Sequence, residues 1–576
     1  MSVRNARRVV HQSAPTRSPV RVPAAVSALA LLLGGATAQQ GSWSAPFNHE
    51  VNTANTNQLT IPITYVWPPT FNAIHMALVP VGPYRGQVLV WDKAEAALRP
   101  YQRWALVDPK WTPGTVRFRN HFLAMPQTLQ TGDLFCSGHV WMRDGRLFVA
   151  GGTATYPNGA NGYFGAALCY QFAPELLDLT TLDYGVWQRE PDLAITRWYP
   201  TVTLLGDDSL LIAGGSDNGV YHNDYEVYRC AQPGRTPPAP MTFDQRTSGG
   251  GNARVYAGPI GPGSFPDYPR IHLLRSGEAF CSGWYRRGFK WRHTPGYQPV
   301  YDFSAGAGSD APNIPYASSI HDPRFGGGDS RIMRIGGNAA GTATPDVESC
   351  NAEVPGQWQQ ELAPFRLNYG RWMQNAVVLP NGNVFVFGGF ADGNNPGVPE
   401  LRPELLTPAG WVVQPPENGA RGYHASAVLL PDGRVFVGGG DIRAVDYQIY
   451  SPPYLTGGQP RPKGIGCDIA PVVGGMHYRL DDPGALYTLW WDENLPAGVT
   501  VDQVVLIRPG SVTHHSDFDQ HFMRLPIEAP DDVAPRECRL RFRPPQDSKQ
   551  MPRGWYMLFA VSNQGVPAEA IWVHLQ

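Results

Sequence analysis

The chain has 576 residues, of which 42% are hydrophobic and 16% are charged. This composition can bury a large core, which excludes a disordered chain, and the length is too great for one ordinary compact domain. The formal net charge is only -2, and lysine and arginine form no long stripe, which excludes the basic surface of a typical nucleic-acid-binding protein. The 63 glycines and 56 prolines lie between hydrophobic runs, which favours an all-β architecture with many turns.

The N-terminus has the three parts of a secretory signal in the right order. A basic region ends near Arg21, an apolar stretch covers residues 22–33, and the small residues Ala36 and Ala38 mark a candidate cleavage site. We therefore expect residues 1–38 to be a cleaved signal peptide and the mature protein to be secreted or periplasmic. The alternative is a disordered basic tail with a chance apolar patch. No later segment has the length and apolar character of a transmembrane helix.

Short apolar runs that end in glycine recur along the next part of the chain. They occupy residues 145–152, 209–215, 277–283, 331–337, 383–389 and 433–440, and their last glycines are 51 to 68 residues apart. A period of roughly 50 residues with four short strands per unit is typical of kelch-type propellers. A weaker copy at residues 74–92 brings the number of units to seven. The sequence therefore predicts a seven-bladed kelch-type β-propeller over residues 39–455.

The repeat ends before a segment rich in proline and glycine, residues 456–466. Beyond it, apolar runs of strand length follow one another without the glycine pattern. These features predict a small antiparallel, immunoglobulin-like β-sandwich over residues 456–576. The segment 510–520 is expected to connect two of its strands. Of the seven cysteines, Cys467 and Cys538 share this region and are the pair that we expect to form a disulfide.

Four residues occupy one position of the repeat, because each lies nine residues before a turn residue. They are Cys136, Tyr199, Met373 and His424, before Gly145, Asp208, Gly382 and Gly433. Equivalent positions of a radial repeat converge in space. The odd number of cysteines in an exported chain leaves at least one thiol outside a disulfide, and Cys136 is the candidate.

Imidazole and phenolate ligands together suit Cu(II), which is also the strongest binder among the divalent first-row metals. Tyr423 precedes His424 and adds a second phenol to the set. Taken singly, each of these residues is more often a packing residue or a satisfied polar group. The shared register, the Tyr423–His424 pair and the odd cysteine together favour a metal or redox site, whereas Met373 has no such chemistry.

Five segments carry a family resemblance. The residues at 134–152, 197–201, 421–440, 450–455 and 511–520 resemble the galactose oxidase and glyoxal oxidase family of copper radical oxidases, in family order and over nearly the whole mature chain. The resemblance implies one copper ion per chain, a protein-derived Cys–Tyr radical, and oxidation of a small aldehyde or primary alcohol with reduction of O2 to H2O2. We also expect a monomer, and the missing basic stripe predicts no nucleic-acid partner.

Matching positions of the motifs imply a role for each site residue. Tyr199 is similar to the copper ligand that bears the radical and is cross-linked through its ring to the sulfur of Cys136. Tyr423 is similar to the ligand that accepts the substrate proton. His424 and His514 are similar to the two imidazole ligands, and His514 is expected on a hairpin that reaches from the C-terminal domain into the propeller axis. His515 is the competing candidate for that position.

The sequence also departs from the family. His521 stands where relatives commonly have arginine, Asp517 stands at an asparagine position, and the stretch 216–228 lacks the tryptophan that stacks on the cross-link in galactose oxidase. The Arg-Trp-Tyr-Pro segment at 197–200 is more similar to the glyoxal oxidase branch, which implies aldehyde hydrates as substrates. Two alternatives stay open, a non-catalytic kelch propeller that binds glycan or protein and a copper-binding protein without turnover.

Overall fold

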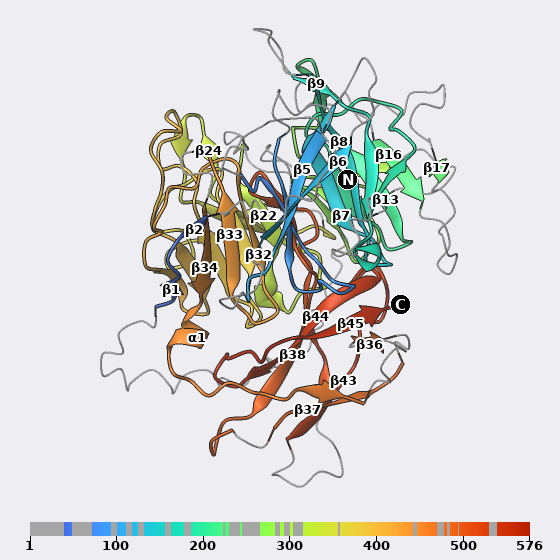
Figure 1. The fold of residues 1–576 in the computed structure, drawn as a ribbon. Coiled ribbons are helices and arrows are strands. Elements are labelled where there is room, and N and C mark those ends of the chain that lie inside the picture. The colour runs from blue at the N-terminus through green and yellow to red at the C-terminus, as the bar shows by residue number, and fades with distance from the viewer. Residues whose placement is uncertain are drawn as a thin grey trace, which may run out of the picture. The chain divides into compact units, whose positions relative to one another are not determined.

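β-Strands account for almost all of the regular structure in the computed structural model (Figure 1). The structure describes residues 40–576 except for the segments 49–71, 94–100, 111–117, 125–131, 156–162, 178–185, 223–224, 230–241, 245–264, 283–287, 293–299, 303–314, 355–357, 442–445, 469–476, 481–483, 493–494 and 529–537. The expected signal peptide, residues 1–38, lies outside the described residues. The helical segments described are η3 (Pro174–Leu176), η5 (Pro323–Phe325) and α1 (Pro453–Thr456). The all-β class expected from the sequence is confirmed.

The described residues form a succession of seven antiparallel sheets, each with four main strands. The first is β3 (His75–Leu78), β4 (Val88–Trp91), β5 (Tyr101–Val107) and β6 (Phe118–Ala124). The second is β7 (Asp133–Trp141), β8 (Leu147–Thr155), β10 (Cys169–Phe172) and β11 (Trp187–Glu190), with β9 (Phe164–Gly165) beside β8. The third is β12 (Thr201–Leu204), β13 (Ser209–Ala213), β16 (Tyr225–Arg229) and β17 (Thr242–Asp244), and the ribbon β14 (Ser216–Asp217) with β15 (Val220–Tyr221) lies within its connections.

The remaining four sheets continue in chain order. The fourth is β18 (Ile271–Leu273), β19 (Ala279–Cys281), β20 (Phe289–Arg292) and β21 (Val300–Asp302). The fifth is β22 (Ser318–His321), β23 (Arg331–Ile335), β26 (Val347–Asn351) and β27 (Gln359–Gln360), with the ribbon β24 (Asn338–Ala339) and β25 (Thr342–Ala343). The sixth is β28 (Asn375–Val378), β29 (Val384–Phe387), β30 (Glu404–Thr407) and β31 (Gly410–Val413). The seventh combines β32 (Ala425–Leu429), β33 (Val435–Gly439) and β34 (Asp446–Ser451) with the N-terminal strands β1 (Ser42–Trp43) and β2 (Phe47–Asn48), drawn in blue beside β34 in Figure 1.

The glycine-ending runs of the sequence are the second strands of these sheets, from β8 through β33. These strands read as continuous apolar runs because sheets pack against both of their faces. The first strand lies at one edge in every sheet except the first, where β39 lies outside β3, and first strands pack against first strands of neighbouring sheets. Such contacts join β7 to β12, β12 to β18, β22 to β28, β28 to β32 and β32 to β3, and His272 of β18 lies 2.9 Å from the Ser319 hydroxyl of β22.

The C-terminal part of the chain forms two further sheets. One contains β35 (Gly466–Cys467), β37 (Tyr487–Trp490), β42 (Ile527–Glu528) and β43 (Arg539–Phe542), and the other contains β36 (His477–Leu480), β38 (Val501–Ile507), β41 (Phe522–Leu525), β44 (Gly554–Ser562) and β45 (Ile571–Leu575). The expectation of a purely antiparallel arrangement is wrong for one pair, because β36 and β45 are parallel. A parallel pair needs a long connection between its strands, and the intervening chain of the whole domain supplies it.

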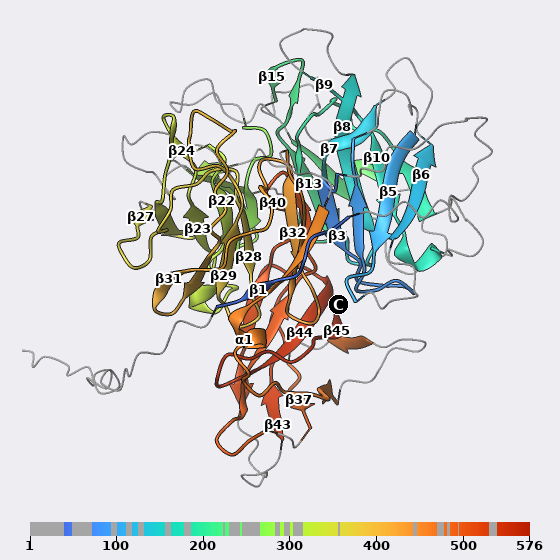
Figure 2. The same ribbon diagram turned by 60° about the vertical axis from the view of Figure 1, so that its left-hand side comes forward.

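The segment 510–520 leaves these two sheets and joins the first sheet of the chain. It forms the hairpin of β39 (Ser511–Thr513) and β40 (Ser516–Asp517), and β39 pairs with β3 in the register His75 to Thr513. Strand β39 also contacts β32 and β7, and Figure 2 shows β40 beside β32 and β3. A C-terminal hairpin is thus inserted between the first strands of the first, second and seventh sheets.

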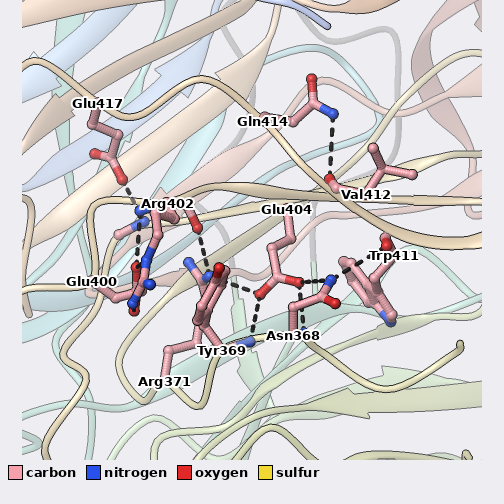
Figure 3. A network of polar contacts seen from close by, with 11 residues as sticks. Asn368, Tyr369, Arg371, Glu400, Arg402, Glu404, Trp411, Val412, Gln414 and Glu417 are labelled. Carbon is pink, nitrogen blue, oxygen red and sulfur yellow. Dashed lines mark hydrogen bonds and ion pairs between the residues drawn. The ribbon is translucent and has the colours of Figure 1, made fainter. Parts of the chain in front are cut away.

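Buried arginines hold the chain immediately before several first strands. Arg371 and Glu404 are both fully buried, and the Arg371 Nη2 donates to Glu404 Oε1 at 2.9 Å (Figure 3). The same relation links Arg197 with Glu226 of β16 and Arg421 with Asp446 of β34. Because each arginine lies two residues before Met373, Tyr199 or Tyr423, the ion pairs hold the candidate site residues relative to the third strand of their own sheets.

The expected disulfide between Cys467 and Cys538 is not compatible with the sheet order. Strand β37 lies between β35, which contains Cys467, and β43, which follows Cys538. Two strand spacings separate the Cα atoms by roughly 10 Å, whereas a disulfide spans at most about 7 Å. In the described part of the chain, no helix is long and apolar enough to cross a membrane.

Candidate functional site

The residues of the shared register meet through their backbones. Cys136, Tyr199 and Met373 have positive φ angles of 65°, 62° and 59°, which non-glycine residues adopt rarely and mainly where the surrounding structure enforces them. Tyr199 N donates to Cys136 O at 3.0 Å, and Tyr268 N donates to Tyr199 O at 2.8 Å. Tyr268 also has a positive φ of 47°, so the same strained geometry recurs at the start of successive sheets and brings these residues together.

Cys136 and Tyr199 are buried side by side. Their exposed fractions are 0% and 4%, and both side chains belong to one cluster of buried residues. The Cys136 Sγ also lies 3.7 Å from His514 Nε2. Burial, followed by the neighbouring Cys136 and Tyr423, raises the pKa of Tyr199 well above its usual value, so the isolated side chain is a neutral phenol.

His514 lies at the centre of the remaining candidates. Its ring centroid is 4.7 Å from that of Tyr199, 5.2 Å from that of Tyr423 and 4.6 Å from that of His424. The rings of Tyr423 and His424 are 4.7 Å apart, and those of Tyr199 and Tyr423 are 6.4 Å apart. The structure therefore brings together all five residues that the sequence singles out, Cys136, Tyr199, Tyr423, His424 and His514.

Both histidines are oriented through their Nδ1 atoms. His424 Nδ1 hydrogen-bonds to a carboxylate oxygen of Asp441, and His514 Nδ1 lies 2.6 Å from Thr513 Oγ1. His424 Nε2 is buried and has no hydrogen-bond partner among the described residues. Burial lowers the pKa of His514 well below its usual value, which keeps its imidazole neutral, as a metal ligand must be.

His515 and Met373 lie at the edge of this group. His515 Nδ1 lies 3.3 Å from the Nη2 of buried Arg270, and the His515 ring is 6.0 Å from the Tyr423 ring. Met373 packs in an apolar cluster with Trp372 and Phe390. The contacts with Cys136, Tyr199 and His424 belong to His514, which favours His514 over His515 as a ligand and leaves Met373 as part of the wall.

Comparisons with known proteins agree with these motifs. Residues 486–575 match the family model described as galactose oxidase-like, early set domain. A galactose oxidase from Gibberella zeae is 25% identical over 546 residues, 90% of this chain and 72% of that protein. An aldehyde oxidase GLOX from Vitis pseudoreticulata is 26% identical over 477 residues, 77% of this chain and 82% of that protein. The chain is thus similar, over most of its length, to members of the galactose oxidase and glyoxal oxidase family of copper radical oxidases.

A solved structure shows the same fold. A fungal alcohol oxidase of the AA5 family in complex with copper superposes with a TM-score of 0.66, covers 93% of this chain and 99% of its own, and is 21% identical in sequence. Both parts of the chain, the succession of four-strand sheets and the C-terminal sheets, therefore belong to one galactose oxidase-like fold.

Two aromatic residues to which the sequence interpretation gave no role at the site stack on Tyr199. The Trp198 ring stacks on Tyr199 at 3.7 Å and an angle of 14°, and the Tyr268 ring stacks at 4.4 Å and 23°. The Tyr268 hydroxyl donates to Ser137 O at 3.0 Å. Tyr268 lies nine residues before Gly277, so the register that identifies Tyr199 also contained the signal for it. Trp198 stacks on the tyrosine even though the family position at 216–228 has no tryptophan.

Two buried histidines, His75 and His139, form a chain of hydrogen bonds that begins at the backbone N–H of Cys136. The Cys136 N–H donates to His75 Nε2 at 3.2 Å, His75 Nδ1 lies 3.2 Å from His139 Nε2, and His139 Nδ1 lies 2.6 Å from Ser511 Oγ. Burial lowers the pKa of His139 to about 3, so this chain of hydrogen bonds is uncharged. It links the cysteine to the hairpin that carries His514, and the sequence offered no periodic signal for it.

The departures from the family lie around the same hairpin. Asp517 Oδ1 accepts hydrogen bonds from the backbone N–H groups of Ser511 at 3.1 Å and Asp519 at 3.0 Å. Asp517 therefore stabilises the turn that presents His514. His521 is buried, and its ring lies 5.3 Å from that of His321. These two positions support the hairpin and do not contact Tyr199 or His424 in the described contacts.

The donor set of the site fits copper. The described residues contain no group of three or more His, Cys, Asp and Glu side chains that could hold a metal ion, so a metal bound here depends on tyrosine oxygens. Two imidazoles and two phenolates form a set that Cu(II) prefers, and the unpartnered His424 Nε2 is available as a nitrogen ligand. Burial raises the pKa of both Tyr199 and Tyr423 well above the usual value, and a bound cation reverses that effect because it stabilises the phenolates.

Proposed function

We propose that the chain is a secreted, monomeric copper radical oxidase that oxidises a small aldehyde, as its hydrate, or a primary alcohol by two electrons and reduces O2 to H2O2. The observation that carries this proposal is that Cys136 and Tyr199 both contact His514. A thiol and a phenol thus lie beside a pair of imidazoles, those of His514 and His424. The similarity to galactose oxidase and to an aldehyde oxidase GLOX over most of the chain supports the proposal.

Tyr199, Tyr423, His424 and His514 would hold the copper. The bound metal would supply one redox equivalent and a position for the substrate oxygen. Tyr199 supplies the second equivalent, because its radical takes a hydrogen atom from the substrate carbon. Tyr423 takes the substrate hydroxyl proton, because its ring lies beside those of the two proposed imidazole ligands, 4.7 Å from His424 and 5.2 Å from His514. Trp198 and Tyr268, stacked on the two faces of Tyr199, exclude water from the radical ring.

We propose that Cys136 and Tyr199, which belong to one buried cluster, form a thioether. Formation of the S–C bond breaks one S–H bond and one ring C–H bond, and dioxygen accepts the two electrons and two protons as hydrogen peroxide. The resulting ring is substituted by sulfur and is more readily oxidised. His75 holds the cysteine backbone during this step through the bond from Cys136 N.

The arrangement of the chain fits a seven-bladed kelch-type propeller over residues 39–455 and a β-sandwich over residues 456–576. The contacts between successive first strands support this arrangement, since they place the starts of the sheets around one region. Met373 then lines the same axis as Tyr199 without chemistry of its own. The cleaved signal over residues 1–38 places the mature N-terminus a few residues before β1, and N-terminal sequencing of secreted protein tests that boundary.

Small aldehydes are the preferred substrates in this proposal. The Arg-Trp-Tyr-Pro segment at 197–200 favours them, and two relatives of similar identity carry the name aldehyde oxidase. A peroxide-coupled screen of methylglyoxal, glyoxal, glycolaldehyde, galactose and simple primary alcohols tests the substrate class. We expect the aldehydes to give the highest kcat/KM, and a clear preference for galactose would reverse the order.

Peptide mapping after copper loading in air tests the mechanism. We expect the fragments that contain Cys136 and Tyr199 to be joined and two hydrogens lighter than the sum of the free fragments. Cys136→Ser should abolish the linkage, whereas Cys169→Ser, at another fully buried cysteine, should retain it. Absence of the linkage in the wild-type protein would remove the radical mechanism and leave the non-catalytic propeller or the simple copper-binding protein.

A further inference from the structure

A stack of four aromatic rings extends from Tyr268 through the radical tyrosine to the protein surface. Beyond the contacts of Tyr199 with Tyr268 and Trp198, the Trp198 ring stacks on Tyr163 at 4.8 Å and an angle of 20°. Tyr268 and Tyr199 are buried, Trp198 is half-buried, and Tyr163 is 38% exposed. The stack therefore gives Tyr199 a continuous ring-to-ring route to solvent.

The backbone around Tyr163 holds this stack together. Asn218 N donates to Tyr163 O at 2.9 Å, and Ala166 forms a β-bridge with Arg197, next to Trp198. Gly165 makes the close approach possible, because a Cβ at this position would lie 2.7 Å from Trp198 N. The segment that carries Tyr163 is thus fastened to the segment that carries Trp198 and Tyr199.

A second group of contacts, made by Ser216 and Asp217, fixes the segments that carry Tyr163 and Trp198. Asp217 accepts a hydrogen bond from Gly165 N at 3.0 Å through one carboxylate oxygen and from the Thr196 hydroxyl at 2.7 Å through the other. Trp198 and Ser216 form a further β-bridge. Three chain segments, around residues 165, 197 and 217, are therefore tied to one another where the rings stack, which keeps the ring distances short.

We propose that Tyr163 and Trp198 form an electron relay, through which a soluble one-electron oxidant withdraws an electron from Tyr199 without entering the active site. The proposal rests on the proposed function, since it needs Tyr199 as the radical residue. The partner is an outer-sphere oxidant, either a small metal complex or a redox protein, that contacts the exposed Tyr163 ring. Indole and phenol are the most readily oxidised aromatic side chains. The rings of Tyr163, Trp198 and Tyr199 are stacked face to face.

The step balances as a single electron transfer. With copper bound, Tyr199 is a phenolate, so loss of one electron leaves the neutral radical and no proton moves at that ring. The oxidant is reduced by one electron. Tyr163 is exposed and returns to its starting state after the electron passes, because it can release its proton to water and recover it. No bond to carbon or sulfur forms or breaks.

The relay is tested by the rate at which the radical forms. Copper-loaded protein whose radical has been removed with ascorbate is mixed without oxygen with hexacyanoferrate(III), and the absorbance of the tyrosyl radical is followed by stopped flow. We expect Tyr163→Leu to slow the bimolecular rate constant several-fold and Tyr163→Trp to restore it, because indole keeps an oxidisable ring in the stack. Tyr221→Leu is the matched control, since Tyr221 is 42% exposed and lies outside the stack.

Copper content and thioether formation, measured by mass spectrometry, show that each variant is intact at the active site. A radical that forms equally fast in the wild type and in Tyr163→Leu overturns the relay alone. Equal slowing by Tyr163→Leu and Tyr221→Leu also overturns it, because it indicates a general effect of the surface. If the wild-type protein forms no radical with any amount of oxidant, the proposed function fails and the relay fails with it.

Discussion

Asp441 should control how tightly the site binds copper, although His424 is the one proposed ligand that it contacts among the described residues. Its carboxylate holds His424 Nδ1 and leaves the buried Nε2 without a hydrogen-bond partner among the described residues. Loss of a carboxylate partner of a ligating histidine commonly lowers metal affinity about 10- to 100-fold, which corresponds to about 1.4 to 2.8 kcal/mol. We expect Asp441→Ala to weaken copper binding within this range and Asp441→Asn to have a smaller effect, because the amide oxygen still accepts the imidazole hydrogen bond.

Competition with a chromophoric chelator measures the affinity directly. The side chain of Asp441 is 41% exposed, so its replacement should leave the free energy of unfolding of the metal-free protein nearly unchanged. Asp392→Ala is the matched control, because Asp392 occupies the corresponding loop of the preceding sheet and its side chain accepts only from Asn394 N at 2.9 Å in the described contacts. Equal copper affinity for the wild type and Asp441→Ala would refute the view that this carboxylate orients the ligand.

Three further changes test the fold and the site. Arg371→Met should destabilise the protein by about 3 to 5 kcal/mol in urea denaturation, because it removes the cationic partner of the fully buried Glu404 carboxylate, whereas Arg543→Met, in a pair whose side chains are 40% and 42% exposed, should cost at most about 1 kcal/mol. Burial raises the pKa of Glu417 to about 8 in the folded protein, whereas the unfolded chain has lost this proton by about pH 5. The free energy of unfolding should therefore fall as pH rises from 5 to 8. Glu417→Gln should make the free energy of unfolding less dependent on pH in this range. His514→Ala should abolish copper binding measured by elemental analysis, and His515→Ala should retain it; the opposite result would exchange their roles.

The repeat could be predicted because each sheet buries the same strand in the same way. The glycine-ending runs correspond to second strands from β8 to β33, since those strands are covered on both faces and must be apolar throughout. The register likewise predicted that Cys136 and Tyr199 meet, because equivalent positions of successive sheets converge. It could not supply His514, because that residue lies on a hairpin outside the repeat, and only the family resemblance indicated it.

The stacking partners of Tyr199 escaped prediction for a different reason. Side chains of neighbouring residues in a strand point to opposite faces, and this alternation alone would turn Trp198 away from Tyr199. The φ of 62° at Tyr199 breaks that alternation and places the two rings face to face. Backbone strain of this kind depends on contacts with other sheets, which the local sequence does not contain. The parallel pairing of β36 with β45 was missed in the same way, because strand direction in a sheet depends on the whole domain.

Strand β1 has a consequence for how the molecule assembles. It pairs with β34 in the register Ser42 to Ser451, and the Trp43 indole donates to Pro415 O, 372 residues further along the chain. Strand β1 is therefore synthesised long before β34, the strand with which it pairs, and contacts of such long range slow folding. Until β1 docks, β34 presents an open edge that a strand from another molecule could occupy. Docking of β1 thus protects the protein from intermolecular strand exchange.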